Sequence, residues 1–123
     1  MRLNDMIRKM NEMETEVRHE MRGGKGDVKF LHAFKGAEMT SPCRVCATLI
    51  LEPGCSIGTH VHDGEDEVYY ILKGTGKLFD GKEYTTVTAG DAVLTGNGES
   101  HSIENIGSDV LEIFAVVITY PKN

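Results

Sequence analysis

Two histidines separated by a single residue carry the clearest chemical signal in this sequence. His60 and His62 lie within the run GTHVHDGEDE, residues 58–67. On a strand, side chains two residues apart point to the same side, with Cα atoms roughly 6.6 Å apart. Two imidazoles at that separation can bind one ion, because zinc–nitrogen bonds, for example, are about 2.0–2.1 Å long. The spacing therefore predicts two ligands of one metal ion.

A carboxylate follows at a useful distance. Residues 63–66 form a polar turn that reverses the chain, so Glu67 begins the returning strand within reach of the same ion. Glu67 could instead be one more member of a solvated acidic turn, which is what we expect of Asp63, Glu65 and Asp66. However, Glu67 precedes the almost wholly apolar stretch 68–72, where a carboxylate needs a partner. We therefore predict that Glu67 is a ligand.

A third histidine has a similar setting later in the chain. His101 follows the glycine-containing turn 96–98 and again begins a strand. His19 and His32 lie elsewhere, and we expect them to be structural or exposed. The sequence thus predicts one divalent metal ion held by His60, His62, Glu67 and His101.

Strands are the elements that must position these side chains. From residue 27 onward, apolar and polar residues alternate with a period of two, and turn signals such as Pro53-Gly54 and Asp80-Gly81 separate the alternating runs. The expected strands are 28–33, 44–51, 67–72, 76–79, 84–87, 92–95, 100–105 and 110–120. Many short strands at this spacing indicate an all-β sandwich or barrel.

The N-terminal segment has a different pattern. Its apolar residues recur at steps of three and four, which predicts one face of a helix that Gly23, Gly24 and Gly26 bring to an end. These apolar residues are Leu3, Met6, Ile7, Met10, Met13, Val17 and Met21. We expect this methionine-rich face to pack on its own domain or on a twin subunit, the alternative being a groove for other partners. The predicted organisation is a helical extension over 1–26 and one β-barrel domain over 27–123.

The two histidine-bearing stretches resemble the paired motifs of the cupin superfamily. The first motif, G(X)5HXH(X)4E(X)6G, fits without a gap from Gly54 to Gly74. The second, G(X)5PXG(X)2H(X)3N, fits from Gly90 to Asn105 except that Gly96 replaces the proline. Proline there stiffens a turn and holds no metal, so the departure leaves the ligands intact. The resemblance covers roughly residues 40–120.

The resemblance implies a fold and a chemistry. The implied fold is an antiparallel double-stranded β-helix, or jelly-roll barrel, often dimeric. The implied cofactor is one divalent metal on three histidines and one glutamate: manganese or iron first, with zinc, nickel or copper as alternatives. Single-domain proteins similar to oxalate decarboxylase domains have the closest motifs, although this chain has no second cupin domain and no evident dedicated proton donor.

Two classes of function fit such a site. The first is a metal-dependent enzyme that decarboxylates, oxidises or isomerises a small oxygen-rich organic acid or sugar-derived substrate. The second is a non-catalytic module that binds or senses a small ligand. Arg44 and Tyr69 are the candidate catalytic residues: Arg44 could fork onto a substrate carboxylate or face solvent, and Tyr69 could bond a ligand or fill the cavity.

Strand parity predicts the two faces of the barrel wall. If Glu67 points inward, so do Tyr69 and Ile71. By the same argument the last strand places 111, 113, 115 and 117 inside, which leaves Phe114, Val116 and Ile118 apolar on the outer face. A strand that is apolar on both faces needs cover on both. We expect a homodimer, with cover by the N-terminal helix as the alternative.

Composition excludes several other functions. The formal charge of −6 over 123 residues argues against binding to nucleic acid or to an anionic membrane surface. The longest apolar run, residues 113–120, is too short to span a bilayer, and the charged N-terminus does not read as an export signal. Cys43, Cys46 and Cys55 are an odd number, so we expect reduced thiols in a cytoplasmic protein.

Overall fold

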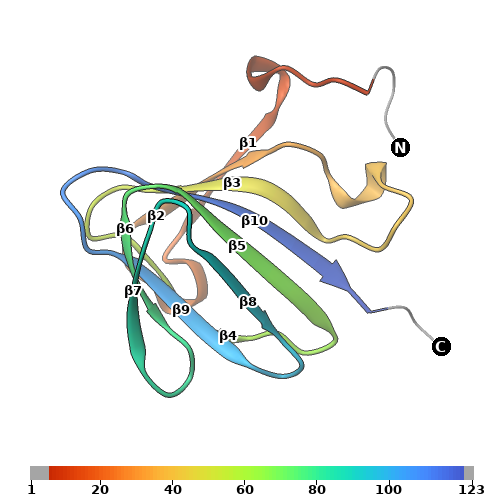
Figure 1. Ribbon diagram of the computed structural model, residues 1–123. Helices are drawn as coiled ribbons and strands as arrows, with labels where there is room; N and C mark the ends of the chain where they lie inside the picture. Colours follow the sequence, from red (N-terminus) through yellow and green to blue (C-terminus); the bar gives the residue numbers. More distant parts are fainter. Residues whose placement is uncertain (1–5, 121–123) are drawn as a thin grey trace.

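Two antiparallel sheets make up the computed structural model, which describes residues 6–120 (Figure 1). The strands are β1 (Glu14–His19), β2 (Asp27–His32), β3 (Val45–Leu51), β4 (Ser56–Val61), β5 (Glu65–Lys73), β6 (Thr75–Phe79), β7 (Tyr84–Thr88), β8 (Ala92–Gly96), β9 (Ser100–Asn105) and β10 (Leu111–Thr119). A 3₁₀ turn, η1 (Met10–Glu12), precedes β1, and two more, η2 (Met21–Gly23) and η3 (Gly36–Glu38), lie in the connections after β1 and β2. Within the described residues, no helix is long and apolar enough to cross a membrane.

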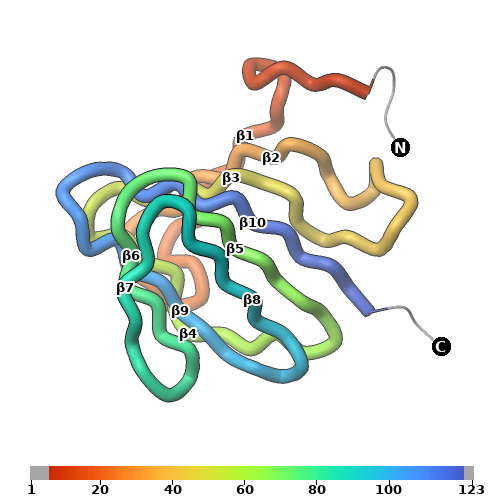
Figure 2. Tube along the Cα trace, in the orientation of Figure 1, coloured from red at the N-terminus to blue at the C-terminus, as the bar shows by residue number. Residues whose placement is uncertain are grey.

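The two sheets enclose the core. One sheet has the order β1-β2-β3-β10-β5-β8, and the other has the order β4-β9-β6-β7 (Figure 2). Apolar side chains from both sheets fill the space between them, including Leu49, Ile57, Ile71, Ile103 and Ile113. The predicted all-β jelly-roll fold is confirmed.

The predicted strand parity is also confirmed. Glu67, Tyr69 and Ile71 of β5 are buried, while Tyr70 and Leu72 on the opposite face are exposed. In β10 the buried residues are the odd-numbered ones from Leu111 to Val117, and Phe114 lies half-buried on the outside. Alternation with a period of two is the geometric consequence of the pleat. It lets one strand serve the interior and the outer surface at once.

The N-terminal segment is the main departure from expectation. Its helical part is minor, limited in the described residues to the single turns η1 and η2, and the predicted continuous helix is wrong. Leu3 lies outside the described residues. Residues Glu14–His19 form β1 instead, paired along its full length with β2. A helix stripe needs a surface to bury it, whereas β2 offers a row of backbone groups and β1 contains the strand formers Thr15 and Val17.

The β1–β2 connection lies against the strand that carries His60. A Cβ atom built on Gly24 would lie 2.2 Å from the carbonyl oxygen of Ser56, and one on Gly58 would lie 2.0 Å from that of Arg22. Only glycine allows two backbones to approach so closely. The Ser56 backbone N–H also donates to the Lys25 carbonyl at 2.9 Å. This connection is therefore fastened to β4, next to the predicted ligands.

Candidate metal centre

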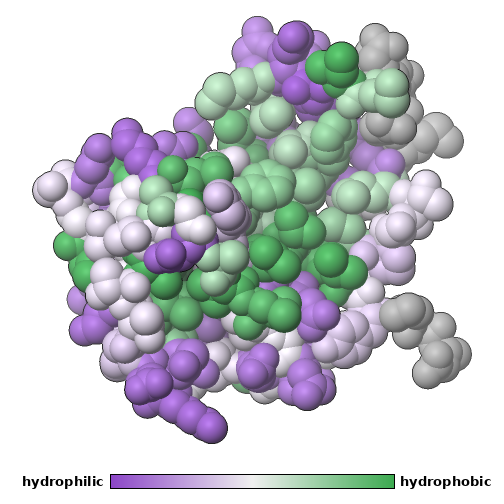
Figure 3. Space-filling model, viewed as in Figure 1, coloured by the Kyte–Doolittle hydropathy of each residue, from purple (hydrophilic) through white to green (hydrophobic). Residues whose placement is uncertain are grey.

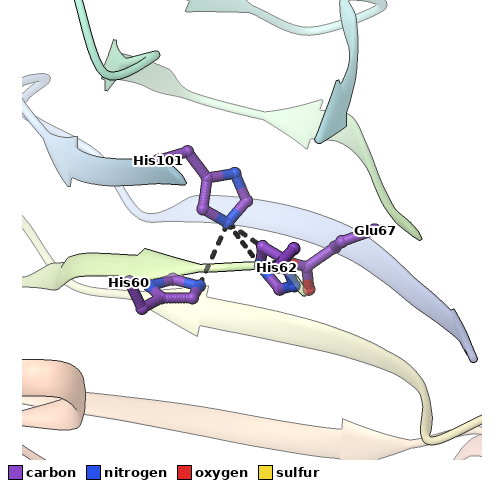
Figure 4. Close-up of side chains that lie close together, drawn as sticks. All are labelled: His60, His62, Glu67 and His101. Carbon is purple, nitrogen blue, oxygen red and sulfur yellow. Dashed lines mark hydrogen bonds and ion pairs between the residues drawn. The ribbon is translucent and has the colours of Figure 1, made fainter. Parts of the chain in front are cut away.

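The structure brings all four predicted ligands together inside the barrel. His60 lies on β4, His62 one residue beyond it, Glu67 on β5 and His101 on β9. Their side chains point toward one another from the two facing sheets (Figure 4). The pairing of β4 with β9 places His60 directly opposite His101. Two strands of one sheet and one of the other thus supply the cluster.

The distances within the cluster are short enough for a common ion. One donor atom from each of the four residues lies within 4.8 Å of all the others. Nε2 of His101 is 3.1 Å from Nε2 of His60 and 3.0 Å from Nε2 of His62. The Glu67 Oε1 atom is 2.8 Å from Nε2 of His62 and 3.0 Å from Nε2 of His101. These atoms form a compact N₃O set of the kind that divalent transition metals bind.

Hydrogen bonds on the far side of each ring fix which nitrogen faces the centre. Nδ1 of His60 is 2.7 Å from the Gly58 carbonyl oxygen, and Nδ1 of His62 is 2.7 Å from the Glu65 carboxylate. Both partners are acceptors, so these bonds assign the ring proton to Nδ1 and leave a lone pair on Nε2. Nδ1 of His101 contacts the Thr95 hydroxyl at 2.9 Å, which can accept in the same way. Metal-binding histidines have this arrangement of outer partners.

The atoms that face one another at the centre of the cluster are therefore all hydrogen-bond acceptors. Oε1 of Glu67 is buried and has no hydrogen-bond partner among the described residues. With the ring protons on Nδ1, the short distances from Oε1 to two Nε2 atoms bring lone pairs together. A buried acceptor without a donor is costly, and a cation among the four atoms would satisfy it. The residues present thus fit a divalent metal.

Burial also keeps His60 in the form that can bind a metal. Desolvation lowers the pKa of His60 to about 4, and the neighbouring imidazoles of His101 and His62 act in the same direction. Its hydrogen bond to Gly58 opposes this shift but does not cancel it. His60 is therefore neutral at physiological pH, as a metal-bound imidazole must be.

A cavity of about 20 Å³ adjoins the cluster. His60, His62, Glu67 and Tyr69 line it together with three arginines, Arg18, Arg22 and Arg44. That volume has room for about one water molecule. The site is therefore small, and three arginines form part of its wall.

The two candidate catalytic residues have different places in this cavity. Tyr69 is buried, stacks on the His101 ring at a centroid distance of 4.9 Å and hydrogen-bonds to Glu67. Burial, and then the Glu67 charge, raise the pKa of Tyr69 well above its usual value, so its hydroxyl stays protonated. Arg44 lies at the entrance with its side chain 43% exposed. Its guanidinium forms a fork on Glu65, with distances of 2.7 and 3.2 Å.

Sequence reasoning missed two residues that hold the ligands. Glu65, expected in a solvated turn, has a side chain only 15% exposed and links His62 to Arg44. Burial would raise the pKa of Glu65, but the hydrogen bonds from Arg44 and His62 outweigh it and lower the value. Thr95 is the other missed residue, and it contacts His101. The signal for Glu65 was its parity with Glu67 on the same strand.

Fold and site together define a class of protein: a small double-sheet barrel with a histidine–carboxylate cluster inside. The Cupin domain family model matches residues 47–117, so the chain belongs to the cupin family.

Two findings from Thermotoga maritima describe similar proteins. The "Oxalate-binding protein" of this organism is 43% identical over 113 residues, which cover 92% of this chain and 93% of that protein. A crystal structure described as a predicted oxalate decarboxylase from the same organism is also 43% identical and has a TM-score of 0.88; the match covers 93% of this chain and 99% of that one.

A more distant structure shares the fold alone. The polyketide cyclase RemF from Streptomyces resistomycificus has a TM-score of 0.75 at 17% identity, with 96% of this chain and 81% of that chain covered. Proteins with this fold therefore differ in what they do, and function has to be argued from the site.

Proposed function

We propose that this protein is a metal-dependent cupin that binds a small oxygen-rich organic acid, with oxalate as the first candidate ligand. The observation that carries the proposal is the unpartnered Oε1 of Glu67, which faces the Nε2 atoms of His62 and His101 in a buried site. His60 completes the set of four ligands. Manganese or iron is the proposed metal, with zinc, nickel or copper as alternatives.

The chemistry of the donor set supports an acidic ligand. Three neutral imidazoles and one carboxylate leave a divalent ion with net positive charge, and a bound metal of this kind attracts oxygen anions and stabilises negative charge that develops on them. Three arginines line the cavity, and two of them, Arg18 and Arg44, form ion pairs with Glu16 and Glu65, which leaves Arg22 to add positive charge. A relative described as an oxalate-binding protein, aligned over nearly the whole chain, supports the same class of ligand.

Catalysis is the second candidate function. One side chain favours it: the Tyr69 hydroxyl, which is held protonated against the Glu67 carboxylate at the wall of the cavity. Tyr69 would orient Glu67 and restrict the space for a ligand, while Arg44, whose fork Glu65 occupies, would hold Glu65 in place beside His62. The reaction would be a decarboxylation, an oxidation or an isomerisation of the bound acid.

The direct test loads purified, untagged protein with Mn²⁺ and then titrates it with oxalate in a calorimeter. We expect about one metal per chain, and oxalate binding that is absent from the metal-free protein. Failure of Mn²⁺, Fe²⁺ and Zn²⁺ to bind would refute the metal site. Metal binding without any response to oxalate or related acids would refute the ligand. Incubation of the loaded protein with oxalate, followed by product analysis, separates binding from catalysis.

We also propose a homodimer formed through the outer face of the six-stranded sheet. Apolar side chains gather over β10, β5 and β8 (Figure 3). The exposed residues of this face are Tyr70, Leu72, Leu94 and Ile118. The described part of the N-terminal segment, residues 6–26, lies elsewhere: Arg8 bonds to Ala33 and Glu38, and β1 pairs at the far edge of the sheet. Burying such a face is worth about 25 cal/mol per Å², and a second copy supplies a matching apolar surface.

Substitution of Phe114, on the same face, tests the dimer. The Phe114→Glu variant places a charge in the proposed interface, so light scattering should change from the mass of two chains to that of one. Glu112→Lys, two residues away on the same face of β10, is the matched control for a change of charge alone. Two outcomes refute the interface: a monomeric wild-type protein, or a dimer that survives Phe114→Glu.

A cytoplasmic location is proposed from the thiols. Cys43, Cys46 and Cys55 are free in the structure. Free thiols are typical of a reducing compartment.

A further inference from the structure

Three of the four arginines in the described residues have carboxylate partners. Arg8 forms an ion pair with Glu38, Arg18 with Glu16, and Arg44 with Glu65. Arg22 has no ion-pair or hydrogen-bond partner for its side chain in the part of the chain that the structure describes. It also lines the cavity beside the metal cluster. Among the positive groups at this entrance, Arg22 is therefore the one whose five N–H donors remain available.

The backbone holds Arg22 in this place. Arg22 is the central residue of the 3₁₀ turn η2 and has φ 56° and ψ 28°, and Glu20 just before the turn has φ 48°. Residues other than glycine adopt the left-handed region only when their surroundings require it. Here the requirement is the contact with β4, where the Arg22 carbonyl approaches Gly58 too closely for any side chain. Gly58 in turn accepts the hydrogen bond from His60.

The turn is fastened on both sides of Arg22. The Glu20 N–H donates to the Gly26 carbonyl at 2.8 Å, and the Gly24 N–H donates to the Met21 carbonyl at 2.9 Å. The Lys25 N–H donates to the hydroxyl of Ser56 at 2.9 Å. The first two bonds close the connection on itself, and the third ties it to β4 at Ser56, four residues before the first histidine. Arg22, an exposed residue that lines the metal cavity, is thus held beside that cavity by a fixed backbone.

We propose that Arg22 is a specificity-determining residue that binds the carboxylate oxygens which the metal does not hold, and so selects dianionic over monoanionic ligands. This inference rests on the proposed function. A guanidinium offers a planar fork that matches a carboxylate in two hydrogen bonds, and such charge-assisted bonds are stronger than neutral ones. Arg44 and Arg18 are less suited to the task because Glu65 and Glu16 already occupy their forks.

The N-terminal segment thereby becomes part of the binding site. The match to the cupin family model begins at residue 47, well after η2. A barrel without residues 1–26 would keep the four metal ligands and lose the free guanidinium. The strand β1 and its pairing with β2 are then the support that positions Arg22.

Calorimetry of Mn²⁺-loaded protein tests the role of Arg22. The variants are Arg22→Gln, Arg22→Lys and the matched control Lys25→Gln, which removes the same charge from the same connection but at a residue that does not line the metal cavity. The two probes are oxalate and acetate. We expect Arg22→Gln to weaken oxalate binding about tenfold or more, Arg22→Lys to lie between, and Lys25→Gln to stay within about twofold of the wild type. Acetate affinity and metal content should change little in all three.

The outcomes separate this inference from the proposed function. If wild-type protein binds oxalate and Arg22→Gln binds it equally well, Arg22 does not select the ligand, and the proposed function stands. If Arg22→Gln weakens acetate as much as oxalate, its effect is general electrostatics, and the selection of dianions is refuted. If the loaded wild-type protein binds neither oxalate nor acetate, the proposed function fails, and the role of Arg22 fails with it.

Discussion

Strand β9 has a buried polar side chain near each end, and the two differ in how they are satisfied. Asn105, near the end of β9, donates to the carbonyls of Leu51 and Asp109 at 2.9 Å and accepts from the Gly107 N–H at 2.9 Å. His101, near the start, faces the Oε1 atom of Glu67, which has no hydrogen-bond donor within residues 6–120. Both side chains of β9 are only 1% exposed.

The difference separates structure from function inside one barrel. At the Asn105 end, donors and acceptors match, so the protein is complete without a ligand. At the His101 end, three imidazole nitrogens and one carboxylate oxygen converge as acceptors, and only a cation can satisfy them together. Both residues belong to the same cupin motif, so the motif alone does not distinguish the two roles; the count of donors and acceptors does.

Removal of a metal ligand at the His101 end is expected to have the largest effect, and that effect is on metal affinity. His62→Ala deletes one of four ligands, so metal affinity should fall by more than the 10–100-fold that is typical for loss of an outer partner. Metal content after dialysis measures the effect, and circular dichroism checks that the barrel remains. A variant that keeps a full equivalent of metal would overturn the ligand assignment.

Removal of the amide at the other end should affect stability instead. Asn105→Ala removes a donor from the buried Leu51 carbonyl and the part-buried Asp109 carbonyl, and an acceptor from the Gly107 N–H, which should lower the free energy of unfolding by about 2–4 kcal/mol. Urea denaturation of the metal-free protein measures this, and metal affinity serves as the second readout. Large loss of metal affinity with unchanged stability would reverse the roles that we assign to the two ends.

The metal ligands and their hydrogen-bond partners were not equally predictable from the sequence. The ligands followed from the spacing of His60, His62, Glu67 and His101, and the period of two correctly predicted which face of β5 and β10 is buried. These features depend on the geometry of a single strand or hairpin. Thr95 was missed because its contact depends on pairing between strands distant in sequence, β8 with β5, which sets Thr95 opposite Glu67. Glu65 lies only three residues from His62, and its local signal, parity with Glu67, was set aside in favour of a solvated turn.

The N-terminal segment was mispredicted for a related reason. Its apolar spacing fits a helix, but Met6, Ile7, Met10 and Val17 are all exposed in the single chain, so the stripe has no core to bury it. Pairing of β1 with the edge of β2 decides the conformation, and that pairing joins residues up to 18 positions apart, Glu14 and His32. The spacing of apolar residues within a short segment does not show which distant strand the segment pairs with.

Removal of an outer partner should have an effect smaller than loss of a ligand. Thr95→Val keeps the shape of the side chain but removes the hydroxyl that contacts Nδ1 of His101 at 2.9 Å. Metal affinity should fall about tenfold, because the ring loses the bond that fixes its orientation. Thr48→Val, on the outer face of β3, is a control for the same change of side chain. An affinity equal to that of the wild type would show that Glu67 and the other histidines alone orient His101.

A third buried polar side chain, His32, can be compared with Asn105 and His101, and its partner has the smallest expected effect on stability. His32 is 5% exposed and, like the metal ligands, has a carboxylate partner, Glu16, at 2.9 Å. Glu16 also bonds to Arg18, and the hydrogen bonds from Arg18 and His32 lower the pKa of Glu16 to about 2. A donor is thus available at this carboxylate, so the pair needs no metal and should contribute only to stability.

The pH dependence of that contribution follows from the direction of the shift. Because the pKa of Glu16 is lower in the folded protein than the usual value of 4.5, its stabilisation is fully present above pH 4.5 and is lost as the pH falls toward 2. The carboxylate side chain is 37% exposed, and solvent screening reduces the effect to less than about 1 kcal/mol. Glu16→Gln should therefore be slightly less stable than the wild type in urea at pH 7, and the difference should shrink at pH 3. A difference that stays constant between these pH values would show that the charge of Glu16 does not stabilise the fold, and that His32 is satisfied by packing alone.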